Sequence, residues 1–271
     1  MGWRDDVRNR FSILKDADKW RDIYVGKAEN VENNMFRKRR DFAVRYIMQK
    51  VKSEAVVLDI GCGAAPVLRE LCKTGYRCIG LDYSADMLRH AKEHLAEEPV
   101  QQALLLQGDS EHLPVATESV DCVVCLGVIS YVTNIETALN EIYRVLDPCG
   151  IAVISYRNLY NTILYDPIRL IKYIFTSAIG LSYKSNKKPS MEIGRSLKPR
   201  EVKRSITDSC FRVAGEVHIS LGTIRINGKV ISDGRLAVQA DKLLTGLFSF
   251  FRLKAVYRWF SDVHVLVLEK V

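Results

Sequence analysis

Long hydrophobic runs are missing from this chain of 271 residues. No stretch reaches the ~18 uninterrupted apolar residues that a membrane-spanning helix needs. Even the apolar segment 120–135 is interrupted by Asp121 and by the polar pair Thr133 and Asn134. The N-terminal stretch 1–22 is charged throughout and lacks the apolar centre and cleavage site of a secretion signal. We therefore expect a cytoplasmic location.

Cysteine is present in an odd number, without the spacing of a disulfide framework. Cys122 and Cys125 lie three apart in a predicted strand and point to opposite faces, so they cannot easily share a disulfide or a metal. His90 and His94 lack a third ligand nearby, and their charged neighbours indicate a solvated helix face. We expect no metal centre, and buried free thiols in a reducing compartment. The seven cysteines are Cys62, Cys72, Cys78, Cys122, Cys125, Cys149 and Cys210.

Negative charge is the scarcer sign, since the net charge is +8 and the pI is near 9.1. The excess lies toward the ends, in segments 37–40, 184–204 and 252–258, whereas segment 54–147 carries more acids than bases. A basic periphery around an acidic core fits an anionic substrate, an acidic membrane surface or RNA. Composition does not choose among these three, and we expect no DNA partner.

Strand-like apolar runs alternate with helical patterns between residues 56 and 156. The helical patterns have apolar residues at i, i+3 and i+4. Strict alternation predicts an α/β fold with an open, doubly wound parallel sheet. Ligands bind such sheets beyond the carboxyl ends of the strands. The predicted strands are 56–60, 78–82, 103–107, 120–126 and 151–156.

The third glycine of a dinucleotide-binding fingerprint is also absent. The first strand leads into Asp59-Ile60-Gly61-Cys62-Gly63, and Pro66 stands where that fingerprint needs glycine for close helix packing. Asp59 would repel a pyrophosphate but suits a ligand that carries positive charge. S-adenosylmethionine is such a ligand, because it brings both an ammonium and a sulfonium.

Four further features follow at regular intervals. Asp82 stands 23 residues after Asp59, at the end of the second strand, where an acid can accept both hydroxyls of a ribose. Ser84 behind it is a predicted helix N-cap. Gly108-Asp109-Ser110 closes the third strand, segment 119–127 forms the fourth, and segment 141–150 supplies a helix and turn before the fifth.

In this order the motifs resemble the class I S-adenosylmethionine-dependent methyltransferases, and among them the small-molecule enzymes related to ubiquinone and menaquinone biosynthesis (methyltransferase domain groups 11 and 25). The likeness covers residues 36–156 well and the tail weakly. It implies a doubly wound, Rossmann-like α/β fold with a mostly parallel seven-stranded sheet whose last strand is antiparallel. It also implies N-terminal helices, a helical insertion after the fifth strand, S-adenosylmethionine as cofactor and S-adenosylhomocysteine as product.

The resemblance assigns roles to individual residues. Gly61 and Gly63 would let the backbone approach the methionine part, and Asp59 would meet its ammonium through water. Asp82 would hold the ribose, and Arg40 would reach the methionine carboxylate. The remaining residues would enclose the adenine or contact the methionine chain. The complete implied set is Arg40, Asp59, Gly61, Cys62, Gly63, Asp82, Tyr83, Met87, Asp109, Ser110, Leu113 and Leu126.

Three positions depart from the family pattern. Ala65 replaces a third glycine of the first turn, and Cys149 replaces a glycine before the fifth strand. Segment 129–132 reads Ile-Ser-Tyr-Val where quinone-type relatives carry histidine or glutamate, so the obvious base and the quinone substrate are both in doubt. The candidate bases that remain are Tyr131, His218 and Tyr156, of which none has a specific signature.

The chain divides into an N-terminal helical lid (1–50), a cofactor-binding core (51–157), a helical insertion that covers the acceptor (158–198) and a C-terminal part with an extra amphipathic helix (199–271). Our hypothesis is methyl transfer to an oxygen or nitrogen of a small-molecule acceptor, with a saccharide or other secondary metabolite favoured.

Two alternatives stay open. One is a lipid-linked or membrane-associated acceptor, in which aromatic-rich helices flanked by Arg252, Lys254 and Arg258 lie at a membrane interface and the protein is peripheral to the membrane. An apolar helix face more commonly packs into a core, however. The other is a non-catalytic RNA-binding protein that retains the fold, against which the ligand acids Asp59, Asp82 and Asp109 are all present.

Overall fold

The structure is a computed structural model that describes residues 30–97, 103–178, 195–223, 225–226, 229–230, 234–250 and 253–271. The first 29 residues of the expected lid, most of the basic segment 184–204 and Arg252 lie outside the described residues. The described part contains a seven-stranded sheet in the order β3-β2-β1-β4-β5-β9-β6. Its strands are β1 (Val56–Ile60), β2 (Arg77–Asp82), β3 (Leu104–Gln107), β4 (Val120–Leu126), β5 (Leu146–Arg157), β6 (Phe211–Ile219) and β9 (Val263–Lys270).

The sheet confirms the predicted fold class. Strands β1 to β5 run parallel, while β9 runs antiparallel to both β5 and β6. The strand order reverses between β1 and β4, so the carboxyl ends of these two strands frame the place where an open sheet of this kind binds ligands. β1 and β4 are both buried almost throughout, as continuous apolar strands covered on two faces should be.

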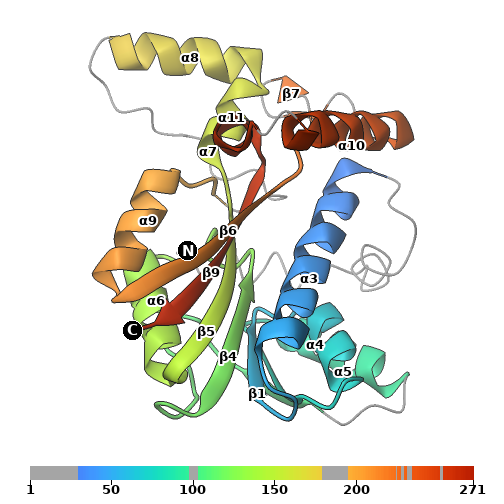
Figure 1. The fold of residues 1–271 in the computed structure, drawn as a ribbon, viewed down its shortest axis with the longest axis vertical. Coiled ribbons are helices and arrows are strands. Elements are labelled where there is room, and N and C mark those ends of the chain that lie inside the picture. The colour runs from blue at the N-terminus through green and yellow to red at the C-terminus, as the bar shows by residue number, and fades with distance from the viewer. Residues whose placement is uncertain are drawn as a thin grey trace.

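Helices cover both faces of the sheet (Figure 1). On one side lie α3 (Val31–Lys50), α4 (Pro66–Cys72) and α5 (Ala85–Ala96), and on the other lie α6 (Ile135–Val145) and α9 (Pro199–Asp208). Leu68 and Leu71 of α4 pack with Val57 in the first layer. Leu139 of α6 and Val202 of α9 pack with neighbouring strand residues in the second. The amphipathic spacing of each helix thus directs its apolar side to the sheet.

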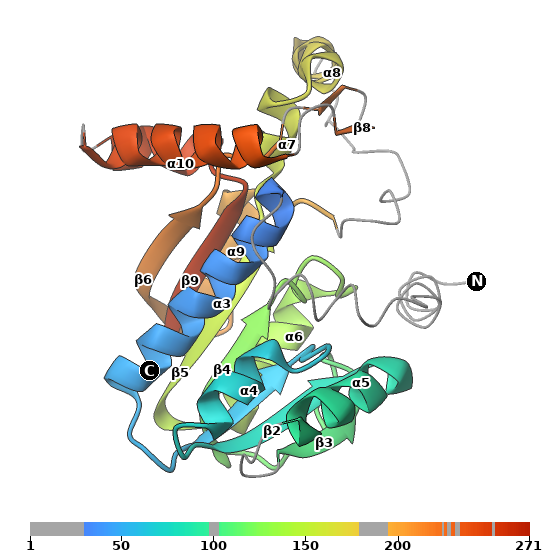
Figure 2. The same ribbon diagram turned by 90° about the vertical axis from the view of Figure 1, so that its right-hand side faces the viewer.

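A cap of four helices stands at one end of the sheet (Figures 1 and 2). The insertion after β5 supplies α7 (Leu159–Leu164) and α8 (Pro167–Ala178), and the tail supplies α10 (Arg235–Phe250) and α11 (Lys254–Phe260). A short hairpin, β7 (Arg225–Ile226) with β8 (Lys229–Val230), precedes α10. Within the described residues, no helix has the length and apolarity needed to cross a membrane.

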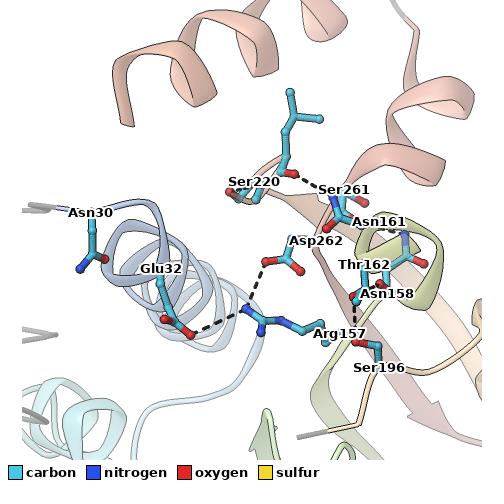
Figure 3. Close-up of polar contacts among 12 residues, drawn as sticks. Asn30, Glu32, Arg157, Asn158, Asn161, Thr162, Ser196, Ser220, Ser261 and Asp262 are labelled. Atoms are coloured by element: carbon cyan, nitrogen blue, oxygen red, sulfur yellow. Dashed lines mark hydrogen bonds and ion pairs between the residues drawn. The ribbon is translucent and has the colours of Figure 1, made fainter. Parts of the chain in front are cut away.

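A polar joint attaches the cap to the sheet (Figure 3). Asn158 is fully buried, and its amide nitrogen donates to the carbonyls of Arg258, Trp259 and Ser261 at 3.4, 3.2 and 2.9 Å. Its amide oxygen accepts from the backbone N–H of Tyr160 at 3.0 Å and caps α7. One side chain therefore satisfies the start of α7 and the end of α11 together.

A buried ion pair completes this joint. Arg157, at the end of β5, lies 3.2 Å from Asp262 and 3.8 Å from Glu32 of α3 (Figure 3). Asn161 donates to the carbonyls of Leu221 and Phe260 at 2.7 and 2.5 Å. These polar contacts link the insertion, the tail and the N-terminal helix to one another.

Several sequence expectations need correction. Cys149 and Cys210 are exposed, so only five of the seven cysteines are buried thiols. His94 is buried rather than on a solvated face. The apolar residues of α8 and α10 that we expected to be core, among them Ile171 and Leu243, are exposed. Periodicity identifies an apolar stripe but does not reveal what covers it.

The joint generates a stability prediction. Asn158→Ala removes an N-cap and three hydrogen bonds to carbonyls at the end of α11, so we expect the free energy of unfolding to fall by about 2–3 kcal/mol. The matched control is Asn134→Ala, which removes only the exposed N-cap of α6 and should cost about 1 kcal/mol. Urea unfolding of both variants measures the difference. Equal losses would show that the carbonyl contacts of Asn158 contribute nothing.

Candidate functional site

The glycine loop, residues 61–65, joins β1 to α4 at the carboxyl end of the sheet. Gly61, Gly63 and Ala65 all have left-handed backbone conformations, with φ of 68°, 53° and 60°. The N–H groups of Gly61 and Cys62 both donate to the carbonyl of Leu81, at 2.7 and 3.0 Å. The loop is therefore coiled back against the end of β2.

Glycine is needed at positions 61 and 63 for different physical reasons. A Cβ on Gly61 would come within 2.2 Å of Val128 Cγ2, so this position admits only glycine beside the loop that follows β4. A Cβ on Gly63 would meet no protein atom within 4 Å. Gly63 thus faces open space, where a ligand can approach the backbone closely. Ala65 accepts the strained conformation that the expected third glycine would adopt freely.

Asp82 organises the loop from the end of β2. Its Oδ2 accepts from the N–H of Gly63 at 2.9 Å, and its Oδ1 accepts from the N–H of Ser84 at 2.9 Å. Ser84 is the N-cap of α5, as predicted, and accepts from the N–H of Met87 at 3.4 Å. An ionised carboxylate offers about four acceptor positions, so each Asp82 oxygen retains capacity for a further hydroxyl.

Asp59 brings a second acid to the same place. Its side chain is only 3% exposed, and burial raises its pKa well above the usual range. The negative charge of Asp82 raises the pKa of Asp59 further, and the positive charge of Arg39 opposes this. Burial also raises the pKa of Asp82, against the hydrogen bonds from Ser84 and Gly63. A cationic ligand would stabilise the charged form of both acids.

Arg39 is the basic residue that α3 directs toward these acids. It is 7% exposed, and a Cβ on Gly127 would come within 2.8 Å of its Nη1. Its guanidinium lies 4.7 Å from the centre of the Phe36 ring, and its buried Nε has no hydrogen-bond partner. Arg40, which we expected here, instead donates to Asp41 Oδ1 from Nε at 2.9 Å and from Nη2 at 2.6 Å.

The segment after β3 lies beside Asp82. The N–H of Gly108 donates to the carbonyl of Asp82 at 3.1 Å, and Asp109 Oδ1 accepts from the N–H of Glu111 at 2.9 Å. Asp109 and Ser110 therefore follow β3 beside the end of β2, where Asp82 holds the glycine loop. The proposed adenine neighbours Met87 and Leu113 are both buried, at the start of α5 and in this segment.

Three more of the implied residues and one candidate base, Tyr131, lie near the same strand ends. Cys62 is buried, and burial raises the pKa of its thiol well above the usual range. Tyr83 is half-buried, and its carbonyl accepts from Gln107 Nε2 at 3.2 Å. Leu126 is half-buried at the end of β4. Tyr131 is half-buried in the following turn, where its N–H donates to the carbonyl of Val128 at 2.7 Å.

The sequence analysis did not identify two buried residues that support these loops. Glu111 accepts from the N–H groups of Thr133 and Asn134 at 3.1 and 2.8 Å, which ties the segment after β3 to the segment after β4. His94 Nδ1 lies 2.8 Å from the carbonyl of Ala64 in the glycine loop. In the sequence, each of them is only a polar residue among polar neighbours. A single sequence cannot show whether such a residue is buried or solvated.

Tyr156 and His218 belong to a different cluster. Tyr156 Oη lies 3.0 Å from His264 Nδ1, and the rings of His218 and His264 are 4.5 Å apart. Burial, followed by the electrostatic interaction with His264, lowers the pKa of His218 to about 4. Burial raises the pKa of Tyr156, which is 1% exposed. These two candidate bases thus form a buried network between β5, β9 and β6 instead of joining the glycine loop.

The same cluster contains a grouping able to hold a metal among the described residues. Donor atoms of Glu216, His218 and His264 lie within 4.8 Å of one another. Glu216 is already paired with Lys203 at 2.8 Å and with Arg258 at 3.6 Å. These two cations would repel a metal ion, so the grouping is better described as a partly buried ion-pair network.

Known proteins share this arrangement. A family model described as "Methyltransferase domain" matches residues 58–154. The chain is 26% identical over 202 residues to the ubiquinone biosynthesis O-methyltransferase of Rickettsia canadensis (strain McKiel), covering 69% of this chain and 81% of that protein. It is 35% identical over 100 residues to the malonyl-[acyl-carrier protein] O-methyltransferase of Yersinia pestis. That match covers 37% of this chain and spans only about a third, 36%, of that protein.

The fold has a solved counterpart over its full length. The crystal structure of magnesium protoporphyrin IX methyltransferase from Synechocystis PCC 6803 with bound S-adenosylhomocysteine superposes with a TM-score of 0.64. The identity is 16%, and 100% of each chain is covered, so this likeness concerns the fold alone. By strand order, glycine loop and sequence, residues 58–154 form a methyltransferase domain of the class I S-adenosylmethionine-dependent type, related to the ubiquinone and menaquinone biosynthesis enzymes.

Proposed function

We propose that this protein binds S-adenosylmethionine at the glycine loop and transfers its methyl group to an oxygen or nitrogen of a small-molecule acceptor. The observation that carries the proposal is the buried acid Asp59 beside the half-buried acid Asp82, at adjacent strand ends next to a backbone open at Gly63. Burial disfavours the charged form of both acids, which is the electrostatic signature of a site for a cation.

Each part of the cofactor has a matching group. The free acceptor positions of Asp82 suit the ribose hydroxyls, and Asp59 suits the ammonium. Arg39, with its unpaired Nε, suits the methionine carboxylate in the role expected of Arg40. Asp109 and Ser110 would hold the polar edge of the adenine, between Met87 and Leu113. Gly61, Cys62, Tyr83 and Leu126 would complete the walls.

The cofactor, when bound, supplies an already activated methyl group. What remains for the chain is to orient the acceptor and to exclude water, and both tasks fall to elements near the end of β4. Tyr131 is the one candidate base in the turn after that strand. Relatives named as O-methyltransferases support an oxygen acceptor, for which a proton must be removed. A saccharide or another secondary metabolite fits a protein without the quinone-type histidine or glutamate.

Titration calorimetry with S-adenosylhomocysteine tests the cofactor site. We expect micromolar or tighter binding by the wild type, and a loss of at least about tenfold in Asp82→Asn, which removes the charge that strengthens two hydrogen bonds. The control is Asp86→Asn, an acid in the first turn of α5 that pairs with Arg89 instead. Absence of micromolar binding by the wild type would refute the proposed function.

The assignment of Arg39 gives a second prediction. Arg39→Ala should weaken S-adenosylhomocysteine binding by about tenfold or more, because a charge-assisted contact to the carboxylate is lost. Arg40→Ala should leave the affinity nearly unchanged, since Arg40 pairs with Asp41 on the surface of α3. The two variants carry the same substitution one residue apart on one helix. A larger loss in Arg40→Ala would restore the assignment made from sequence.

Acidification should weaken cofactor binding. The ammonium of the ligand favours ionised Asp59, whose pKa is raised in the free protein, so affinity should fall as the pH falls through that raised pKa. In Asp59→Asn the affinity should be lower at neutral pH, and its pH dependence should be shallower. Calorimetry from pH 8 downward measures both slopes. Parallel slopes in the wild type and Asp59→Asn would assign the titration to another group.

A further inference from the structure

The cap presents apolar side chains outward on two of its helices. Leu236, Leu243 and Leu247 of α10 recur at helical spacing on one face, and Leu236 is 81% exposed. On α8, Ile171 and Phe175 are 67% and 66% exposed. Further exposed apolar residues at the same end of the molecule are Leu164, Ile168, Ile174, Leu244, Leu253, Val256 and Trp259. A soluble surface rarely gathers so many large apolar residues without a partner.

The opposite side of α10 is fixed to the rest of the protein. Val238 is buried, and Asp241 accepts from Ser220 Oγ at 2.9 Å and from the N–H of Leu221 at 2.6 Å. Lys38 of α3 lies 3.3 Å from Asp241. The helix is therefore held in one orientation by its polar and buried side, and its leucine face points away from the core because of that attachment.

Charge on the cap helices is almost entirely positive. Helices α8, α10 and α11 together contain six basic residues and one acid, Asp241, which is buried and paired with Lys38. Arg235 and Lys242 lie exposed on α10 beside its leucine face. The six bases are Arg169, Lys172, Arg235, Lys242, Lys254 and Arg258. An apolar face flanked by bases is the composition of helices that lie in the headgroup region of a membrane.

We propose that the cap docks on an anionic membrane surface, with the apolar faces of α8 and α10 in contact with lipid. A second copy of this chain is the less suitable occupant, because two cap faces of the same positive sign would repel each other. An anionic lipid surface complements the bases and accepts the apolar residues at the same time. Docking does not depend on the proposed methyl transfer, although it would bring a lipid-linked acceptor within reach.

Vesicle flotation with the full chain tests the proposal directly. We expect binding to phosphatidylcholine vesicles with about 30% phosphatidylglycerol to exceed binding to pure phosphatidylcholine by at least about tenfold, and to weaken with added salt. Equal binding to both vesicle types, or none to either, would overturn the proposal. S-adenosylhomocysteine affinity, measured on the same protein, reports on the cofactor site separately.

Two matched pairs of variants locate the surface. Leu243→Ser with Leu247→Ser should reduce flotation by at least about tenfold, whereas Leu104→Ser, at an equally exposed leucine on the sheet-edge strand β3, should not. Arg235→Gln with Lys242→Gln should remove the preference for anionic lipid, whereas Lys50→Gln with Lys52→Gln should retain it. Unchanged S-adenosylhomocysteine affinity shows that each variant is folded.

Analytical ultracentrifugation tests whether a second copy of this chain, and not a membrane, covers the apolar faces of α8 and α10. The proposal expects the wild type to sediment as the same species as Leu243→Ser with Leu247→Ser in the absence of lipid. A stable dimer that this double variant dissociates would assign the face to a second copy and overturn membrane docking.

Discussion

The carboxylate of Asp82 is the contact on which the site depends. It accepts one hydrogen bond from the glycine loop and one from the start of α5, so a single side chain sets the positions of two loops at adjacent strand ends. The side of the loop at Gly63 stays open to a ligand, because a Cβ there would meet no protein atom within 4 Å. The same carboxylate disfavours ionisation of Asp59 beside it, which couples the shape of the loop to its electrostatics.

This coupling lowers the stability of the protein when no ligand is bound. Two acids whose charged forms are disfavoured lie next to a buried arginine whose Nε lacks a hydrogen bond. Such groups destabilise an empty site and are compensated elsewhere, here by the long pairing of β5 with β9 and by the two apolar layers on the sheet. A site built in this way gains most from a ligand that carries both signs of charge, as the amino-acid part of the cofactor does.

Sequence reasoning predicted the sheet and the positions of its strand ends correctly, because those features are local. Alternating apolar runs mark β1 to β5, Asp59 and Asp82 stand in the last residues of β1 and β2, and Asp109 comes just after β3. Arg39 and Arg40 could not be distinguished, because neighbouring residues on a helix differ by about 100° in direction and only the packing of α3 shows which is buried. Glu111, His94 and the exposure of the α10 leucines depend on contacts between distant segments, and no local pattern encodes these.

The position of β9 has a consequence for how the chain is made. Among the strands that the structure describes, β6 pairs with β9 alone, and β9 separates β6 from β5. The ribosome must therefore synthesise residues 263–270 before β6 can pair, while β1 to β5 can assemble earlier. Between these two moments, one side of β5 and the whole of β6 expose unpaired backbone. The nascent chain is then vulnerable to aggregation. A chaperone would act most usefully during this interval.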